Sequence, residues 1–230
     1  MLEKLISAGA FGLINAGWGY ILGIFACAIA GYLIGSVSFT TVFAEKAGCE
    51  PNVTSMVGTR GVGYTLAALS LDLLKGAVCS LVGLLLMPGD GFMGVCGLFG
   101  VIGQCKPLYR RFRGGEAFPV AIGASLVMNP VMAAACAIIG FCMYAVSGYV
   151  SLGALAASCI FPFIARRLPL WVFIAPGEQE TLVSLVNTLL DNLTPIALAI
   201  AVLFAYASNL GRMMAGDEDK LPLKRKNLQK

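Results

Sequence analysis

The feature that most constrains the fold is a continuous apolar run from about Trp18 to Phe43. A helix over this run is long enough to cross the roughly 30 Å hydrocarbon layer of a bilayer. Similar runs follow, and only 12% of the residues are charged while 58% are hydrophobic, whereas a soluble domain has roughly 25% charged residues. Because the runs are continuous and do not alternate, they exclude a transmembrane barrel. The sequence therefore predicts an all-α integral membrane protein.

About seven transmembrane helices are expected, one of them short. The short one covers 118–128, which is about half the usual length of a span and ends at Asn129-Pro130. The other six are expected over 18–43, 63–87, 92–102, 131–147, 150–165 and 194–213. The polar stretch 44–61 is expected to form a loop. Residues 176–193 mix acidic and amide side chains with apolar residues at helical spacing, which predicts an interfacial amphipathic helix.

Basic residues predict the orientation of these helices. Four of the sixteen lie between Lys106 and Arg113, and six lie between Arg212 and Lys230. Membrane orientation explains such clusters better than nucleic acid does, because cytoplasmic loops collect Lys and Arg. The C-terminus is then cytoplasmic, seven crossings put the N-terminus outside, and the 44–61 and 103–117 loops share the cytoplasmic face. Arg166 and Arg167 would fall outside, which counts against this topology.

Three segments follow from this organisation. Residues 1–18 lack the basic start and small-residue cleavage site of a signal peptide, so they are expected to be an interfacial N-terminal segment. Residues 19–216 form the polytopic membrane domain, and residues 217–230 form a basic cytoplasmic tail.

Residue types missing from the chain exclude several chemistries. Histidine is absent, which excludes Ser-His-Asp and Cys-His catalysis and the commonest metal ligand. Eight cysteines lie mostly inside apolar runs with no CxxC pair, which is typical of small packing residues. No metal site and no cofactor are expected.

The loop before the short helix is a candidate anion site. The guanidinium groups of Arg110, Arg111 and Arg113 stand next to Gly114 and Gly115, whose backbone N–H groups a ligand can approach closely. The alternative is that these basic residues only orient the protein in the membrane. Glu116, beside the glycines, would repel an anion and favours that alternative.

Two sets of polar residues within the apolar helices can also be interpreted either as structural or as functional. Asp72 and Lys75 lie three residues apart on one helical face, so they either pair inside the bundle or face a substrate. Ser36 and Ser38 offer hydroxyl groups near the end of the first span, although serines in such helices often bond only the preceding turn.

Five segments in order resemble one family. They are Gly31-Tyr-Leu-Ile-Gly-Ser-Val-Ser-Phe39, Leu71-Asp-Leu-Leu-Lys-Gly-Ala77, Gly97-Leu-Phe99 continuing through Gly103 to Phe112-Arg-Gly-Gly115, Tyr149-Val-Ser-Leu-Gly153, and Asn209-Leu-Gly-Arg-Met-Met-Ala-Gly-Asp-Glu218. Over residues 20–218 the chain resembles the acyl-phosphate:glycerol-3-phosphate acyltransferases of bacterial membranes, the PlsY family.

The departures from the family pattern concentrate where that family does its chemistry. Ser38 stands in the place of a proline, and the asparagine-containing second motif has no counterpart in the shorter segment around Thr54–Gly61. Gln104 replaces a histidine, and Glu116 replaces a lysine, so that Glu116→Lys would restore the family's charge. Near the C-terminus, Tyr206 and Ala207 stand close to where the family has histidine and arginine.

The resemblance implies a transfer of a fatty acyl group from acyl phosphate to glycerol 3-phosphate, giving lysophosphatidate in the bacterial inner membrane. Phosphate is a good leaving group, so positioning and oxyanion stabilisation can supply the rate without a covalent enzyme intermediate. The resemblance implies catalytic roles for Ser36, Arg113 and Asn209. It implies substrate-binding roles for Arg60, Lys75, Gly114 and Gly115.

Two other functions stay open on the sequence. A non-catalytic relative would bind a lipid, an acyl phosphate or a protein partner in the same helical scaffold, and Glu116 together with the missing second motif favours it. A small transporter or channel has only the intramembrane Asp72 and Lys75 in its favour.

Overall fold

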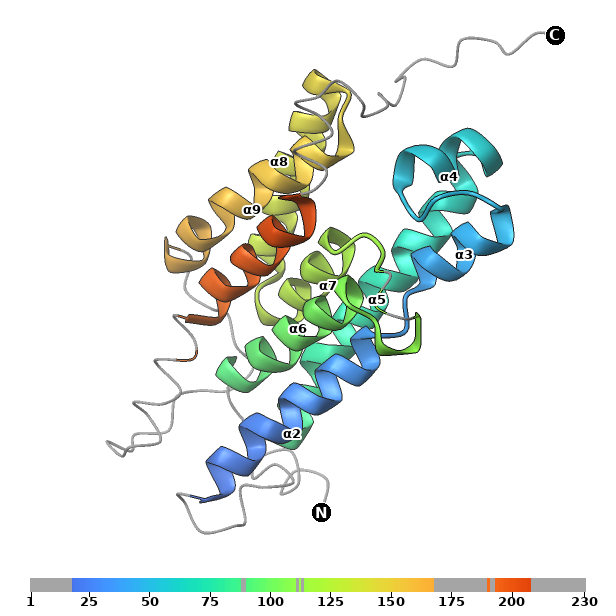
Figure 1. Ribbon diagram of the computed structural model, residues 1–230. Coiled ribbons are helices and arrows are strands. Elements are labelled where there is room, and N and C mark those ends of the chain that lie inside the picture. Colours follow the sequence, from blue (N-terminus) through green and yellow to red (C-terminus); the bar gives the residue numbers. More distant parts are fainter. Residues whose placement is uncertain are drawn as a thin grey trace, which may run out of the picture.

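A computed structural model describes residues 18–87, 90–110, 112, 114–167, 190 and 193–207. Every regular element in this part of the chain is a helix, which confirms the predicted fold class (Figure 1). The elements are α2 (Trp18–Gly35), α3 (Phe39–Ala47), α4 (Val53–Arg60), α5 (Val62–Leu86), α6 (Asp90–Cys105), the 3₁₀ turn η1 (Leu108–Arg110), α7 (Phe118–Met128), α8 (Pro130–Ser147), α9 (Val150–Arg167) and an unlabelled helix over Leu193–Ala207.

Most of the described helices are apolar, and several have the length of a membrane span. Four segments are long and apolar enough to cross a bilayer: Gly19–Ala47, Val62–Leu86, Gly91–Arg110 and Pro130–Ser147. Three shorter apolar helices cover Phe118–Met128, Val150–Phe163 and Leu193–Ala207. Large apolar side chains such as Phe25, Phe141 and Phe204 are more than half exposed, as is expected of side chains that face lipid. The protein is therefore a multi-pass membrane protein.

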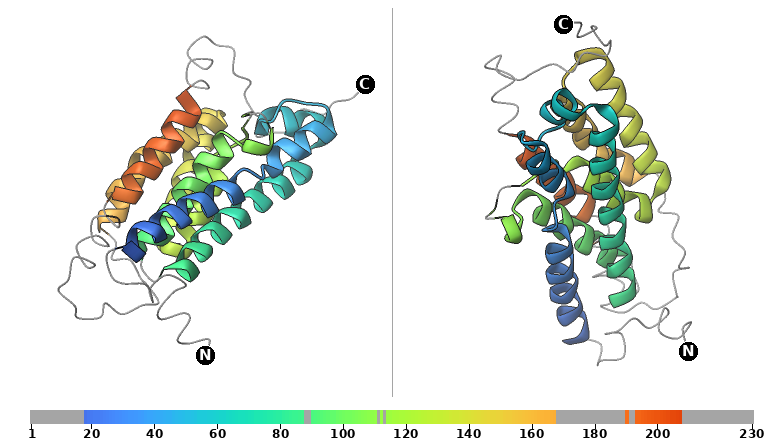
Figure 2. Two further views of the ribbon diagram at one scale, coloured as in Figure 1. Left: turned by 60° about the horizontal axis from the view of Figure 1, so that its bottom comes forward. Right: turned by 90° about the vertical axis from the view of Figure 1, so that its right-hand side faces the viewer.

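The short helix α7 lies inside the bundle. It contacts α5, α6 and α8, and the views in Figures 1 and 2 agree that other helices surround it. Seven of its eleven residues are buried, so it has no distinct polar face. The sequence predicted a short helix here, and the structure explains why eleven residues suffice: neighbouring helices, and not lipid, cover most of its surface.

The predicted first span is broken. The sequence suggested one helix over 18–43, whereas α2 ends at Gly35 and α3 begins at Phe39. Ser38 is the N-cap of α3, with an extended backbone and a side chain that accepts a hydrogen bond from the Thr41 N–H at 3.3 Å. Since a capping serine competes with helix continuation, the chain turns at this point.

The stretch 44–61 is also not the loop that the sequence suggested. It contains the end of α3 and the whole of α4, with Gly48 as the left-handed C-cap of α3 (φ 71°) and Asn52 as the N-cap of α4. This segment contacts the 103–117 segment: Glu45 pairs with Arg110, and Glu116 accepts a hydrogen bond from the Val53 N–H at 3.3 Å. The two polar segments thus lie at one end of the bundle, as the topology requires.

Several predicted segments lie outside the described residues. They are the interfacial segment 1–18 up to Gly17, the amphipathic helix 176–193 except for Leu190 and Leu193, the end of the last span from 208 to 213, and the tail 217–230.

Glycines set the distance between the central helices. A Cβ on Gly76 of α5 would lie 2.1 Å from the Val120 carbonyl oxygen of α7, and a Cβ on Gly123 of α7 would lie 1.9 Å from the Leu73 carbonyl oxygen. Both obstructions are backbone atoms that a rotamer change cannot move. The two helices therefore pack at a separation that only glycine permits.

Gly76→Ala is expected to destabilise the bundle by about 1–3 kcal/mol, because the added methyl group forces α5 and α7 apart. Thermal unfolding of the detergent-solubilised protein would measure this as a fall in Tm. Gly63→Ala is the matched control on the same helix, since nothing lies within 4 Å of its Cβ. That control should be neutral, or stabilising by up to about 1 kcal/mol through helix propensity. Equal Tm values for both variants would contradict the close α5–α7 contact.

Candidate functional site

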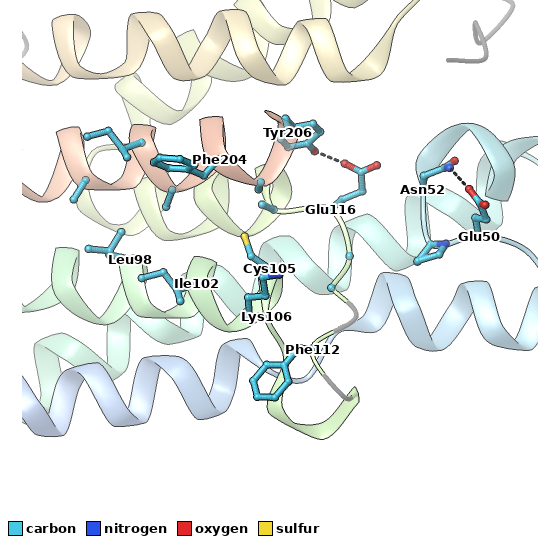
Figure 3. Close-up of a pocket in the computed structure, with 18 residues that line it drawn as sticks. Glu50, Asn52, Leu98, Ile102, Cys105, Lys106, Phe112, Glu116, Phe204 and Tyr206 are labelled. Atoms are coloured by element: carbon cyan, nitrogen blue, oxygen red, sulfur yellow. Dashed lines mark hydrogen bonds between the residues drawn. The ribbon is translucent and has the colours of Figure 1, made fainter. Parts of the chain in front are cut away.

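A cavity of about 910 Å³ opens between α6 and the helix 193–207, next to the start of α4 (Figure 3). One side is apolar and carries Leu98 and Ile102 from α6, and Ile200 and Phe204 from the facing helix. The other end is polar and is formed by residues of the 105–117 segment and of the turn before α4. The polar side chains there belong to Glu50, Asn52, Lys106 and Glu116, together with Tyr206 from the facing helix, and Gly114 and Gly115 line the same end. The cavity is therefore amphipathic, like a lipid.

The glycine pair at the polar end is closely packed, Gly114 against backbone atoms and Gly115 against side chains. A Cβ on Gly114 would lie 2.2 Å from the Cys105 carbonyl oxygen, and a Cβ on Gly115 would lie 2.7 Å from Ser38 Oγ. The Gly115 N–H donates to the Gln104 carbonyl oxygen at 3.3 Å. Phe112, just before this segment, has φ 62°, a left-handed conformation that is rare for a bulky residue. The turn around the glycines is thus held in one defined shape.

Glu116 ties three parts of the site together. Its side chain is 8% exposed, and it accepts hydrogen bonds from the Val53 N–H at the start of α4 and from the Tyr206 hydroxyl group on the last described helix. Figure 3 shows Tyr206 pointing towards this carboxylate. The sequence suggested that Glu116 repels an anion, but the structure also gives it two donors, which makes it a structural link at the cavity.

Ser36 lines a second cavity, of about 800 Å³, which is also lined by residues of α3. Its hydroxyl group donates to the Tyr32 carbonyl oxygen at 2.7 Å, which is the bond to the preceding turn that serines in apolar helices often make. Ser38 and Thr41 share the cavity, and their hydroxyl groups bond each other at 2.7 Å. Ser36 and the glycine pair therefore line different cavities.

Lys75 is buried in the bundle, and its ammonium group has four hydrogen-bond acceptors. They are the carbonyl oxygens of Gly35 (3.1 Å) and Val37 (2.7 Å), Asp72 Oδ1 (3.1 Å) and Gln104 Oε1. The Asp72–Lys75 ion pair that the sequence suggested is thus formed. Lys75 is not among the residues that line the two cavities.

The remaining candidate residues are placed only in part. Arg60 is exposed at the end of α4 and lines neither cavity. Arg113 and Asn209 lie outside the described residues. The residues on either side of Arg113, Phe112 and Gly114, both line the first cavity. The expectation that Ser36, Arg113 and Asn209 converge on one cavity therefore stays a prediction.

Sequence reasoning missed how three polar residues act. Gln104 and Tyr206 were noted only as departures from a family pattern, and Thr40 was not singled out. In the structure all three are buried and bonded to Asp72 or Glu116. Their signal in the sequence is a polar residue next to a helix end or inside an apolar run, which alone does not reveal the partner. Within the described residues, no group of three or more Cys, Asp or Glu side chains is placed to hold a metal ion.

Comparisons with known sequences agree on one family. A family model described as glycerol-3-phosphate acyltransferase matches residues 25–216. A glycerol-3-phosphate acyltransferase of Shouchella clausii is 31% identical over 214 residues, which cover 87% of this chain and 97% of the relative. Its counterpart in Halalkalibacterium halodurans is 30% identical over 208 residues, covering 86% of this chain and 95% of that relative.

Solved structures share the fold. A crystal structure of PlsY (YgiH), described as an integral membrane glycerol 3-phosphate acyltransferase in its glycerol 3-phosphate form, superposes with a TM-score of 0.71 at 20% identity. The match covers 90% of this chain and 99% of that chain. The lysophosphatidic acid form of the same protein gives a TM-score of 0.69, covering 86% and 95% of the two chains. At this identity the likeness shows the fold alone.

Proposed function

The chain belongs to the glycerol-3-phosphate acyltransferase family, and from this premise we propose that it is a membrane acyltransferase of phospholipid synthesis. It moves a fatty acyl group from acyl phosphate to glycerol 3-phosphate and releases lysophosphatidate and phosphate. It works in a bacterial inner membrane with its C-terminus in the cytoplasm, and it needs no cofactor.

The amphipathic cavity is the observation that carries this proposal. A water-soluble phosphorylated acceptor and a donor with a long acyl chain must meet, which requires a polar end joined to an apolar wall. The cavity of about 910 Å³ has both, with Gly114 and Gly115 at one end and Leu98, Ile102 and Phe204 along the other side. A soluble substrate alone would not need the apolar wall.

The reaction is a direct acyl transfer. A hydroxyl oxygen of glycerol 3-phosphate attacks the acyl carbonyl carbon, and the tetrahedral intermediate expels phosphate, while the hydroxyl proton passes to the departing phosphate. Because phosphate is a good leaving group, the protein's main tasks are to position the two substrates and to stabilise the oxyanion.

We assign the residues to these tasks as follows. Arg113 binds substrate phosphate with its guanidinium fork. Arg60, which is exposed at the end of α4 and lines neither cavity, is given no substrate contact. Gly114 and Gly115 let the backbone approach the ligand. Ser36, which lines the second cavity, and Asn209 are assigned hydroxyl and amide contacts to the reacting groups. Support for Arg113 comes from its sequence neighbours, Phe112 and Gly114, which both line the cavity.

The test is an assay of purified protein with acyl phosphate and radiolabelled glycerol 3-phosphate, with lysophosphatidate identified by mass spectrometry. Other phosphorylated acceptors, such as dihydroxyacetone phosphate, are tested in parallel. The expected result is product that depends on both substrates and appears with equimolar phosphate release. Absence of product with every acceptor would reject the enzymatic function.

A non-catalytic relative that binds acyl phosphate or a lipid is the second candidate. The observation that favours it is the buried Glu116 at the cavity, which brings a carboxylate close to where a phosphate would bind. Binding of acyl phosphate without turnover in the same assay would support this candidate.

Gly115→Ala is expected to lower the acyl-transfer rate by roughly 100-fold, because the new methyl group would lie 2.7 Å from Ser38 Oγ and 3.1 Å from Gln104 Nε2. Either the turn or its two neighbours must shift, which displaces the substrate contacts. Gly58→Ala in α4 is the control, since nothing lies within 4 Å of its Cβ. Unchanged kcat/KM in Gly115→Ala would argue against a substrate site at the glycine pair.

A further inference from the structure

The break between α2 and α3 leaves backbone groups without helical partners inside the bundle. At the end of a helix the last carbonyl groups lack intrahelical donors, and at the start of the next helix the first N–H groups lack acceptors. The two ends also carry opposite partial charges, negative at the end of α2 and positive at the start of α3. Ser36, a proposed catalytic residue, lies in this joint.

Asp72 on α5 binds the positive side of the joint. Its Oδ1 accepts a hydrogen bond from the Phe39 N–H, and its Oδ2 accepts one from the Thr40 N–H, both at 3.0 Å. The Thr40 hydroxyl group donates to the same Oδ2. The carboxylate thus satisfies the first amides of α3 and lies at the end where a negative charge is favoured.

Lys75, one turn further along α5, binds the negative side. Its ammonium group donates to the carbonyl oxygen of Gly35, the last residue of α2, and to that of Val37 in the joint. It also pairs with Asp72 at 3.1 Å. The two side chains are 0% and 4% exposed, so their charges interact without solvent screening and each matches the helix end that it contacts.

Gln104 joins this pair to the substrate cavity. Its amide nitrogen donates to Asp72 Oδ2 at 3.0 Å and to the Glu116 carbonyl oxygen at 3.2 Å, while its oxygen accepts from Lys75. Glu116 follows the glycine pair directly in the sequence. The network therefore connects the joint that carries Ser36 with the turn that carries Gly114 and Gly115.

A buried ion pair needs an explanation beyond stability. Removing two charges from water costs several kcal/mol per ion, and apolar residues of similar volume often stabilise a protein as well or better. Here each charge is bonded to backbone groups of a specific polarity, which apolar residues cannot replace. What the pair provides is one defined geometry of the joint.

We propose that Asp72 and Lys75 are positioning residues that act as a two-charge cap on the α2–α3 break and so fix Ser36 relative to the glycine turn. This inference rests on the proposed function for its kinetic consequences. Its structural content is independent of catalysis, because it predicts that Asp72 protects the amides of Phe39 and Thr40 from exchange.

The kinetic test compares Asp72→Asn, Lys75→Met and the reversed pair Asp72→Lys/Lys75→Asp. Each is expected to lower kcat by roughly 100-fold, since misplacing a contact by about 1 Å can have that effect, with the KM for acyl phosphate within about twofold. The reversed pair keeps an ion pair but gives each helix end the wrong charge, so it should not restore kcat. Ser70→Ala, an exposed position on the same helix, is the control.

Two kinetic results would overturn the proposal. A reversed pair with wild-type kcat would mean that only the ion pair matters and not its polarity. If Lys75 instead contacts substrate phosphate, then Asp72→Asn should lower the KM for glycerol 3-phosphate by removing a nearby negative charge, and Lys75→Arg should retain activity.

Hydrogen exchange tests the cap without any activity. In Asp72→Asn, and in the milder Thr40→Val, amide exchange of the 36–41 segment is expected to accelerate at least 10-fold while that of α8 stays unchanged. Thr40→Val keeps both charges and removes one hydroxyl bond, so it serves if the charge variants fail to fold. Unchanged exchange in 36–41, or equal acceleration throughout the bundle, would reject the cap. Absence of wild-type product would reject the proposed function alone.

Discussion

Arg113→Ala is expected to abolish lysophosphatidate formation and to leave the membrane fold intact. Arg113 is the cation that this chain keeps beside the glycine pair where the family pattern has a lysine. A guanidinium group that holds a reacting phosphate contributes in the transition state, and removing one such donor typically lowers the rate by about 100- to 1,000-fold. Product formation at matched expression, with Tm as the measure of folding, would test this.

Two variants separate charge from geometry in that experiment. Arg113→Lys keeps the charge but loses the bidentate fork, so an intermediate rate is expected. Arg110→Ala removes a cation from the same loop whose guanidinium group pairs with Glu45, and it should retain most of the activity. Identical rates for wild type and Arg113→Ala would shift the assignment towards the non-catalytic candidate.

The longer helices could be predicted from the sequence because their limits are local. The α8 and α9 helices begin and end within about two residues of the predicted runs, since Asn129-Pro130 marks the start of α8 and Gly148 marks the break between α8 and α9. The α5 helix likewise matches the predicted run 63–87. Local residue types decide these boundaries, so a local pattern suffices.

The break in the first span could not be predicted because its cause is not local. The run from Trp18 to Phe43 is apolar except for the hydroxyl residues Ser36, Ser38, Thr40 and Thr41 near its end, and none of these alone requires a helix to end. The ends that the break creates are stabilised by Asp72 and Lys75, more than 30 residues away in sequence. A sequence pattern shows that these charges exist but not which backbone groups they meet.

The candidate site, too, could be predicted only where its features are local in the sequence. The glycine pair was recognised because it stands beside a cluster of arginines, which is unusual in an apolar chain, and it does line a cavity. The role of Glu116 was inferred from its charge alone, which suggested repulsion of an anion. Its partners, the Val53 N–H and the Tyr206 hydroxyl group, are 63 and 90 residues away. Only the fold brings them together.

These contacts reverse the expectation for Glu116→Lys. The family pattern suggests that a lysine here raises activity or leaves it unchanged. In this chain, a lysine would leave the Val53 N–H and the Tyr206 hydroxyl group without their acceptor, which is expected to destabilise the protein by about 1–3 kcal/mol for each donor. The drop should appear as a Tm lower by several degrees, at about 2–4 °C per kcal/mol, together with reduced acyl transfer.

Two further variants identify the cause of that loss. Glu116→Gln keeps an acceptor oxygen for the Val53 N–H, and its amide nitrogen can donate to the Tyr206 oxygen, so most of the stability should remain. In Glu116→Lys/Tyr206→Phe the unpaired hydroxyl group is gone, and the loss should be smaller than the sum of the two single losses because the residues are in contact. Strict additivity, or a Glu116→Lys protein as stable as wild type and more active, would show that the residue at position 116 acts through its charge alone.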